Sequence, residues 1–300
     1  MYDHILVPTD GSDHVEPAVE YALDLAQHYD CTVHALHVVD SSPIERKLEL
    51  TALDDESPPE SWHAAGGDAT QRIADRAMDR GIQVETEVRR GIPAREIAAY
   101  VDDNDIDLVS MGTRGHTGLD RLLLGSVTTR IVRTVDVPVI CVSARETDPA
   151  TELQQSVQFD NILVPTDESK PAQDAVARAL DIARTYGATL HGLYVIDRRA
   201  YASRPGSTWT DLQQVLENHG TNILEELESN AEGANVPAVT EVRHGVPHRA
   251  IQEYAADTDV NLIVMGTHGR SGLSRQIIGS VTERVLRSSD VPVLTTRPSG

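Results

Sequence analysis

Three glycines and a serine follow an apolar run of the sequence in a spacing that could bind phosphate. After residues 106–111 come Gly112, two residues, Gly115, nine residues, and then Gly125 and Ser126. Glycine lets the main chain approach phosphate oxygens closely and adopt positive φ. The N–H groups of a helix beginning near Gly125 would be unpaired and would lie at the positive end of the helix dipole. The pattern predicts a phosphate-binding loop, in which the Ser126 hydroxyl either donates to phosphate or caps the helix.

The same spacing occurs a second time, at Gly266, Gly269, Gly279 and Ser280, and the three glycines are all displaced by 154 residues. The residues between the glycines differ between the two copies. A loop that needed glycine only for a sharp strand-to-helix turn could have lost it in one copy. The repetition therefore favours phosphate binding over the simpler interpretation of a tight turn.

Basic residues accompany both glycine loops. Arg114 and His116 in the first copy are matched by His268 and Arg270 in the second. In such an acidic chain, cations beside a phosphate loop are candidate phosphate contacts. The alternative, that these side chains pair with surface acids, stays open.

Short apolar strands and amphipathic helices alternate around these loops. In the first half we expect strands at 4–8, 32–39, 82–88, 106–111 and 137–142, helices at 15–29, 69–80 and 94–103, a further helix after Ser126, and a loop over 41–67. This alternation predicts parallel strands joined by right-handed crossovers. Because open sheets of this kind bind ligands at the carboxyl ends of their strands, the glycine loops would lie at the binding edge.

An aspartate ends the first strand of each half, in the sequence Val-Pro-Thr-Asp. These residues are Asp10 and Asp167. An ionised carboxylate only accepts hydrogen bonds, which suits the hydroxyl groups of a ribose. An Asx-type turn or a helix cap would also place an aspartate here, and that alternative stays open.

The two halves repeat one order of elements. Their offset is 157 residues at the aspartates and 154 at the glycines, so the first half is three residues longer between its second and third strands. A repeat of this length indicates duplicated domains rather than a solenoid. We predict domains at 1–145 and 159–300, joined by a linker at 146–158.

The pattern Gly-x2-Gly-x9-Gly-Ser after an apolar strand that ends in Met-Gly resembles the ATP-binding signature of the universal stress protein family. The resemblance implies two flavodoxin-like (Rossmann-like) α/β domains, each with a five-stranded parallel sheet sandwiched by helices. It implies an adenine nucleotide, ATP or AMP, in each domain, and a stress-response role as a nucleotide-dependent sensor or regulator read by an unidentified protein partner. In that family the aspartate contacts ribose, and the main chain at the positions of Val38 and Val195 contacts adenine.

The predicted nucleotide-binding residues are Pro8, Thr9, Asp10, Val38, Met111, Gly112, Gly115, Gly125, Ser126 and Val127 in the first half, and Pro165, Thr166, Asp167, Val195, Met265, Gly266, Gly269, Gly279, Ser280 and Val281 in the second. Single domains of the family dimerise through their last strands. Residues 137–142 and 291–296 could make that contact within this chain, and a homo-oligomer stays open.

Composition excludes several classes of partner. The 300 residues carry a formal charge of −21, which argues against nucleic acid and anionic membranes as partners. With no run of 18 apolar residues, we expect no membrane span and a cytoplasmic protein. Such acidity resembles proteins of a high-salt cytoplasm, so we expect a halophilic source. Cys31 and Cys141 lie in apolar runs and are expected to be buried and inert.

Two other nucleotide-binding motifs are absent, and no catalytic machinery is evident. A P-loop would need a lysine before Ser126, and a dinucleotide fold would need Gly-x-Gly-x-x-Gly after the first strand. Hydrolysis needs a base and usually Mg²⁺, yet Asp120 in the first loop is matched by Ser274. We expect no metal site of the protein's own, although Mg²⁺ could accompany the phosphates. A slow ATP hydrolase and an interaction scaffold with vestigial sites remain the alternatives.

Overall fold

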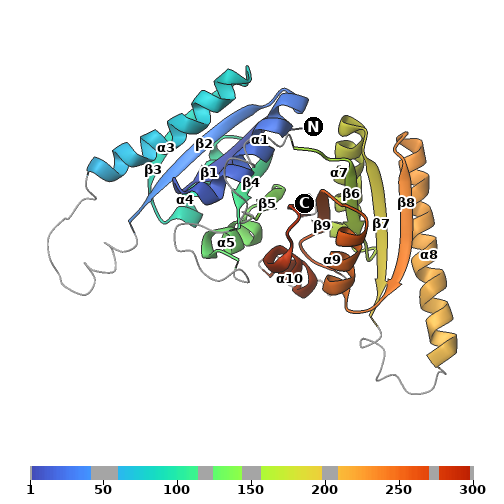
Figure 1. Ribbon diagram of the computed structural model, residues 1–300. Coiled ribbons are helices and arrows are strands. Elements are labelled where there is room, and N and C mark those ends of the chain that lie inside the picture. Colours follow the sequence, from blue (N-terminus) through green and yellow to red (C-terminus); the bar gives the residue numbers. More distant parts are fainter. Residues whose placement is uncertain are drawn as a thin grey trace, which may run out of the picture. The chain divides into compact units, whose positions relative to one another are not determined.

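The computed structural model describes residues 2–41, 60–113, 124–143, 157–197, 209–269 and 277–297. The chain divides into two compact units, Met1–Val157 and Gln158–Gly300. Figure 1 shows that each unit is a sheet with helices on both of its sides. The predicted linker falls mostly in 144–156, outside the described residues, so the predicted domain limits stay a prediction.

The first unit alternates strands and helices along the chain. Its elements are β1 (His4–Thr9), a short 3-10 helix η1 (Asp13–Val15), α1 (Glu16–Tyr29), β2 (Thr32–Asp40), α3 (Glu60–Asp79), β3 (Val84–Gly91), α4 (Pro93–Asp103), β4 (Leu108–Gly112), α5 (Ser126–Thr134) and β5 (Val139–Val142). The ends of the predicted strands shift by a few residues, which is expected where a strand passes into a loop.

The second unit repeats this order. Its elements are β6 (Asn161–Pro165), α7 (Lys170–Tyr186), β7 (Thr189–Ile196), α8 (Trp209–Gly233), β8 (Ala238–His244), α9 (Pro247–Asp257), β9 (Leu262–Gly266), α10 (Ser280–Ser288) and β10 (Val293–Thr296). In each unit the first two helices pack on one face of the sheet and the last two on the other, as right-handed crossovers require.

All strand pairs within the two units are parallel. The strand order is β3-β2-β1-β4-β5 in the first unit and β10-β9-β6-β7-β8 in the second. The chain therefore moves outward from β1 to β3 and then returns to β4 on the other side of β1. A crevice opens at the carboxyl ends of the strands where this order reverses. The predicted fold of five-stranded parallel sheets between helices is confirmed.

The spacing of apolar residues agrees with which faces of each strand and helix are buried. The five residues of β4 and of β9 are all buried, as expected for strands covered by helices on both faces. In α1 the buried residues include Ala18, Val19, Ala22 and Ala26, which recur on one face of the helix. The core thus lies between each sheet and its two helical layers.

Helix α3 begins earlier than predicted. It starts at Glu60, whereas we predicted a loop up to residue 67, so Gly66 lies inside a helix. A Cβ on Gly66 would lie 2.5 Å from Cδ2 of the His37 ring, and one on Gly220 in α8 would lie 2.5 Å from Cδ1 of Tyr194. Glycine costs a helix about 1 kcal/mol relative to alanine. Glycine at these places leaves room for the rings of His37 and Tyr194 beside the helices. The loop prediction was wrong for residues 60–67.

Both cysteines are buried, as predicted. Burial, together with nearby carboxylates at Cys31, raises the pKa of each thiol to about 12. Neither is therefore a reactive thiolate near neutral pH. No helix in the described parts of the chain combines the length and apolar character that a membrane crossing requires.

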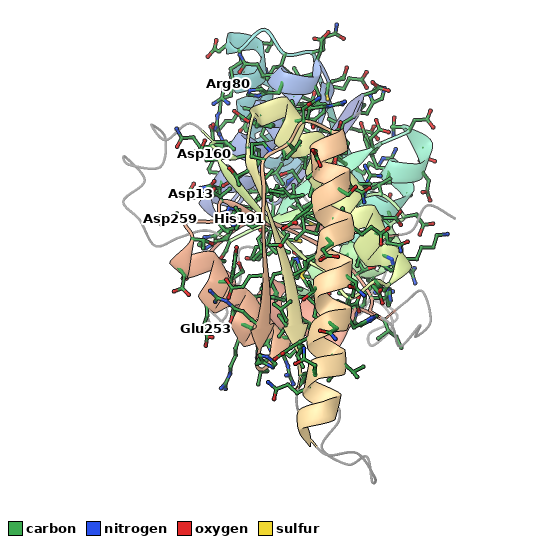
Figure 2. All side chains as sticks on the ribbon, turned by 90° about the vertical axis from the view of Figure 1, so that its right-hand side faces the viewer. Asp13, Arg80, Asp160, His191, Glu253 and Asp259 are labelled. Atoms are coloured by element: carbon green, nitrogen blue, oxygen red, sulfur yellow. The ribbon has the colours of Figure 1, made fainter. Side chains whose placement is uncertain are left out.

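No aspartate or glutamate is buried in the part of the chain that the structure describes. Figure 2 labels Glu253 and Asp259, which are exposed and project from the second unit, and His191, which is buried on β7. The acidic surface and the apolar interior are thus separated, as they are in any stable fold that carries a large net charge.

Candidate functional site

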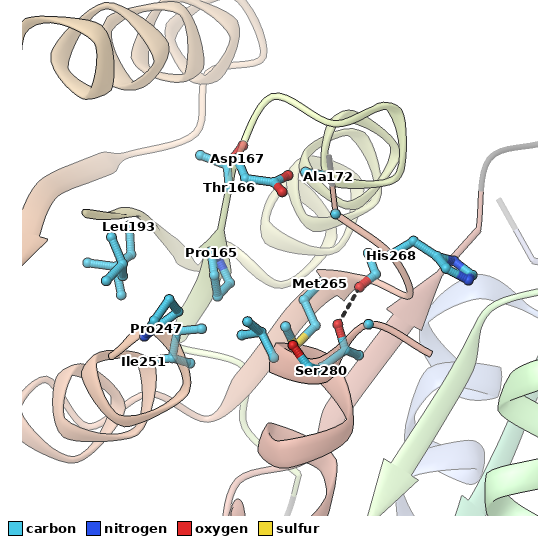
Figure 3. A pocket seen from close by; sticks show the side chains of 16 residues that line it. Pro165, Thr166, Asp167, Ala172, Leu193, Pro247, Ile251, Met265, His268 and Ser280 are labelled. Carbon is cyan, nitrogen blue, oxygen red and sulfur yellow. Dashed lines mark hydrogen bonds between the residues drawn. The ribbon is translucent and has the colours of Figure 1, made fainter. Parts of the chain in front are cut away.

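A cavity of about 240 Å³ lies at the carboxyl ends of β6, β7 and β9 in the second unit (Figure 3). It is lined by Pro165, Thr166, Asp167, Ala172, Leu193, Val195, Pro247, Ile251, Met265, Gly266, His268, Gly269, Gly279, Ser280, Val281 and Thr282. The cavity occupies the crevice where the strand order reverses, which is the edge that the sequence predicted for a ligand.

The cavity brings together the residues predicted from the second copy of the motif. The end of β6, Val195 on β7, the end of β9, Gly269 and the start of α10 all contribute to its wall. Of the predicted residues in this half, only Arg270 is missing from the lining, and it lies outside the described residues. The structure thus gathers these residues, and their role toward a nucleotide stays a prediction.

One wall of the cavity is apolar and was missed by the sequence analysis. Leu193 precedes Val195 by two residues on β7, and Pro247 and Ile251 are one turn apart on α9. A signal was available, because Pro93 and Ile97 occupy the matching places of the first half. This wall can accept a flat apolar group, while the glycine loop and Asp167 make the opposite wall polar (Figure 3).

The two ends of each glycine loop are held together by a backbone hydrogen bond. The N–H of Gly279 donates to the carbonyl of Thr267 at 2.7 Å, and the N–H of Gly125 donates to the carbonyl of Thr113 at 2.8 Å. A Cβ on Gly279 would lie 3.3 Å from that carbonyl oxygen. Glycine at this place lets the first turn of the helix close against the strand end.

Gly266 has a packing role within the protein. A Cβ at this position would lie 2.6 Å from Cβ of Pro171 and 2.8 Å from its carbonyl carbon. The first turn of α7 thus rests directly on Gly266. Gly266 also lines the cavity, and its predicted role in the approach of phosphate stays a prediction.

The carboxylate of Asp167 reaches across to the glycine loop. A Cβ on Gly269 would lie only 2.6 Å from Oδ2 of Asp167, so the glycine leaves room for that oxygen. The other oxygen, Oδ1, accepts the N–H of Ser169 at 3.1 Å, and Asp10 accepts the N–H of Ser12 at the same distance. Both aspartates therefore form the Asx-type turn that was left open, with the second oxygen of Asp167 turned toward the loop.

Helices α5 and α10 present uncapped N-termini. Gly125 and Gly279 occupy the N-cap positions, so no side chain caps either helix. Ser126 and Ser280 are the first helical residues and are exposed. The first N–H groups of a helix that lacks a cap favour a bound anion.

His268 contributes its main chain more than its ring. The ring nitrogen Nδ1 lies 2.9 Å from the Thr267 hydroxyl, and the carbonyl accepts the Ser169 hydroxyl at 3.4 Å. Figure 3 shows the ring directed away from the apolar wall of the cavity. Contact between the His268 side chain and phosphate stays a prediction.

The first unit places its predicted residues in the matching positions. Pro8 and Thr9 lie on β1, Asp10 follows them, and Val38 is on β2. Met111 and Gly112 end β4, and Gly125 caps α5, where Ser126 and Val127 form the first turn. Arg114, Gly115 and His116 lie outside the described residues.

Each unit also contains a chain of hydrogen-bonded polar side chains that joins a helix, α4 or α9, to two neighbouring strands. The hydroxyl of Tyr100 and Nδ1 of His34 are 2.9 Å apart, and the other ring nitrogen of His34 lies 3.0 Å from His4. In the second unit Tyr254, His191 and Asn161 form the matching chain. Burial lowers the pKa of His34 and of His191, and burial with nearby glutamates raises the pKa of Tyr100 to about 12.

Among the residues that the structure describes, His, Cys, Asp and Glu form no group of three or more that could hold a metal ion. The described part of the site offers main-chain N–H groups, hydroxyls and one carboxylate, which can donate and accept hydrogen bonds.

Comparison with known proteins identifies relatives over the whole chain. The profile of the universal stress protein family matches residues 1–143 and again 158–297. A universal stress protein of Methanocaldococcus jannaschii is 36% identical over 47% of this chain and 82% of its own length. One of Mycobacterium tuberculosis is 26% identical over 98% of this chain and 97% of its own. The crystal structure of a universal stress protein from Archaeoglobus fulgidus, 25% identical, matches with a TM-score of 0.70 over 99% of this chain and 96% of that one.

Proposed function

The chain belongs to the universal stress protein family, and from that premise we propose that each unit binds one adenine nucleotide, ATP or AMP, at the carboxyl edge of its sheet. The observation that carries the proposal is the cavity of the second unit. It combines an apolar wall, a carboxylate, a glycine loop and an uncapped helix start in one space. An adenine nucleotide has matching parts in the same order: base, ribose and phosphates.

The phosphates would lie against the glycine loop and the start of α10. Three features support this placement: the N-cap is Gly279, the hydroxyl of Ser280 is exposed, and both residues line the cavity. Main-chain N–H groups at a helix start bind phosphate without a lysine. Mg²⁺ arriving with the phosphates is compatible with this arrangement.

The ribose would hydrogen-bond to Asp167, and the base would lie against Leu193, Pro247 and Ile251. One oxygen of Asp167 is already held by the Ser169 N–H, so the carboxylate is oriented before the ligand arrives. Pre-orientation lowers the entropy cost of binding. Contact between adenine and the main chain of Val195 rests on the family resemblance.

The biological role would be that of a stress-response sensor or regulator, whose nucleotide-bound state a protein partner recognises. The duplicated site supports binding of two nucleotides per chain. The contact between the last strands of the two halves, proposed from the family, would make the chain equivalent to a dimer of single domains.

Calorimetric titration of the full chain with ATP, AMP and GTP tests the proposal. We expect two ATP per chain and weaker binding of GTP. Asp167→Ala should abolish one of the two sites, and Asp10→Ala the other, because each removes the acceptor for the ribose hydroxyls. Absence of ATP and AMP binding by the wild-type chain at millimolar nucleotide would overturn the proposal.

A further inference from the structure

A buried threonine occupies the third residue of α5 and of α10. Thr128 is 3% exposed and Thr282 is 4% exposed. The hydroxyl of Thr128 donates to the carbonyl of Gly112 at 2.9 Å. That of Thr282 donates to the carbonyl of Gly266 at 2.8 Å, the bond marked by the dashed line in Figure 3. Each bond joins the helix to the last residue of the strand before the glycine loop.

These bonds are not the usual local bonds of a helical threonine. A threonine inside a helix commonly donates to a carbonyl of the preceding turn, three or four residues earlier. Here donor and acceptor are 16 residues apart in both units. The whole glycine loop lies between them, so the bond spans the loop instead of stabilising the helix.

The threonine bond lies beside the backbone bond that closes the loop. In the second unit, the carbonyls of two successive residues, Gly266 and Thr267, are both held by the first turn of α10. The first accepts the Thr282 hydroxyl, and the second accepts the Gly279 N–H. The first unit repeats the pair with Thr128 and Gly125. These two bonds form what we call the neck of the loop.

We propose that Thr128 and Thr282 are positioning residues, which hold the neck closed so that the start of the helix faces the phosphates of the bound nucleotide. The inference rests on the nucleotide sites proposed above and adds to them the residues that fix the angle between strand and helix. Both threonines act through the main chain of the loop. Neither needs to touch the nucleotide with its own hydroxyl, because that hydroxyl already donates to a carbonyl.

The neighbouring serines differ from the threonines in exposure. The sequence Gly-Ser-Val-Thr occurs in both halves, and its serine is exposed while its threonine is buried. The serine hydroxyl is thus accessible to a ligand, whereas the threonine hydroxyl donates to a main-chain carbonyl, and Thr282 also contributes to the cavity wall. The two hydroxyl residues of this motif therefore differ in exposure and in the partners they can contact.

The experiment compares two double variants of the full chain. Thr128→Val with Thr282→Val keeps the shape of the side chains but removes the hydroxyls, and Thr128→Ser with Thr282→Ser keeps the hydroxyls. Affinities for ATP and for adenosine, which lacks phosphates, are measured by calorimetry. We expect the valine variant to bind ATP about tenfold more weakly, the effect of one lost hydrogen bond to a buried group. Adenosine binding should stay within about twofold, and the serine variant should restore ATP binding.

Amide hydrogen exchange of the same variants tests the neck without any nucleotide. The N–H groups of Gly125 and Gly279 should exchange at least about tenfold faster in the valine variant than in the serine variant. If the double valine variant does not fold, Thr282→Val alone provides the comparison, with the first unit as its internal reference.

The outcomes separate this inference from the proposed function. If the valine variant loses as much affinity for adenosine as for ATP, the threonines have a general structural role. If the amide exchange of Gly125 and Gly279 and the ratio of ATP to adenosine affinity are both unchanged in that variant, the threonines have no role in the neck. Either result overturns the inference. If the wild-type chain binds neither ligand, the proposed function fails, and with it the positioning of phosphates, even where exchange still shows a closed neck.

Discussion

The two units have the same fold and matching candidate sites, but different ion pairs hold their helices in place. Bonds that surround the glycine loop repeat almost without change: the threonine bond measures 2.9 and 2.8 Å, and the neck N–H bond 2.8 and 2.7 Å. The guanidinium of Arg89 lies 4.7 Å from the ring centre of Tyr100, and Arg243 lies at the same distance from Tyr254.

The contacts of α1 and α3 have no such repetition. In the first unit, Arg76 on α3 pairs with Glu16 and Glu20 on α1, and Arg80 pairs with Glu20 at 2.6 Å. The place of Arg76 is taken by Asn230 in the second unit. There, His219 on α8 instead pairs with Glu168 at 3.0 Å, in the loop that follows β6.

This difference indicates which contacts are constrained by the site. A contact that sets the shape of the glycine loop has one geometry that works, so both halves retain it. A contact that only joins two helices can be replaced by another of similar strength. Repetition between the units therefore favours a functional role for the neck bonds. It is not sufficient by itself, because the contact of Arg89 with Tyr100 also repeats and is not one of these bonds.

The largest effect is expected at Gly266, where the second unit packs α7 on the glycine loop. Gly266→Ala should destabilise the second unit by about 2–3 kcal/mol, because the new Cβ overlaps the main chain of Pro171, which cannot move freely. Denaturant unfolding followed by hydrogen exchange measures the loss in each unit. Gly233→Ala is the control, since a Cβ there meets nothing within 4 Å. A loss below about 0.5 kcal/mol in Gly266→Ala would contradict the packing role.

The next effect concerns the residue after each aspartate. Gly11 has φ +80° and Glu168 has φ 63°, so both adopt a left-handed backbone. Gly11→Ala should cost the first unit about 1 kcal/mol, because space is available, with Ala69 Cβ at 3.6 Å, but the conformation is strained for alanine. Glu168→Gly should change stability less, because relief of strain offsets the lost pair with His219. Chemical denaturation measures both free energies of unfolding. A cost of Glu168→Gly as large as that of Gly11→Ala would contradict the relief of backbone strain at Glu168.

Arg76→Asn gives the first unit the residue of the second. At low salt the substitution should lower the free energy of unfolding of the first unit by about 0.5–1 kcal/mol, because Arg76 contacts two carboxylates. At molar salt the loss should be smaller, because salt screens these charges. Asn230→Ala serves as the matched control and should change little. Melting temperatures over a salt series check this, and an effect that persists undiminished at high salt would mean that Arg76 acts by packing.

The smallest effect is a pH dependence. Burial lowers the pKa of His34 below 6.5. The nearby carboxylate of Glu85 raises this pKa, and His4 lowers it further. Because the unfolded chain then binds the proton more readily, the stability contributed by neutral His34 is present above about pH 6.5 and is lost as pH falls through the lowered folded pKa. His4→Asn copies Asn161 of the second unit and should reduce the acid loss in the first unit. The free energy of unfolding of each unit, measured at pH 7.5 and at pH 5, tests this, and the second unit should be unchanged by the substitution. If the first unit of the variant loses as much stability at pH 5 as that of the wild type, His4 is excluded as a cause.

Much of this fold could be predicted from the sequence, because short apolar runs and repeated turns leave few alternatives. Gly66 shows where that reasoning failed. We predicted a loop there, but Gly66 lies in α3 beside the ring of His37 from β2, and a contact between distant residues cannot be read from the local sequence. Val195, Asp167 and the glycines were predicted from repetition and resemblance. Leu193, Ile251 and Thr282 were not, because an apolar or hydroxyl residue looks the same in sequence whether it lines a cavity or fills a core. The repeated Gly-Ser-Val-Thr was visible in the sequence, but the direction of the threonine hydroxyl was not.

The most direct test counts nucleotides on the intact chain. Native mass spectrometry of the full protein with ATP should show two bound molecules, and Asp10→Ala or Asp167→Ala should each reduce the count to one. The account of two equivalent sites would be contradicted by a wild-type chain that binds no ATP, or by one that still binds two after either aspartate is removed.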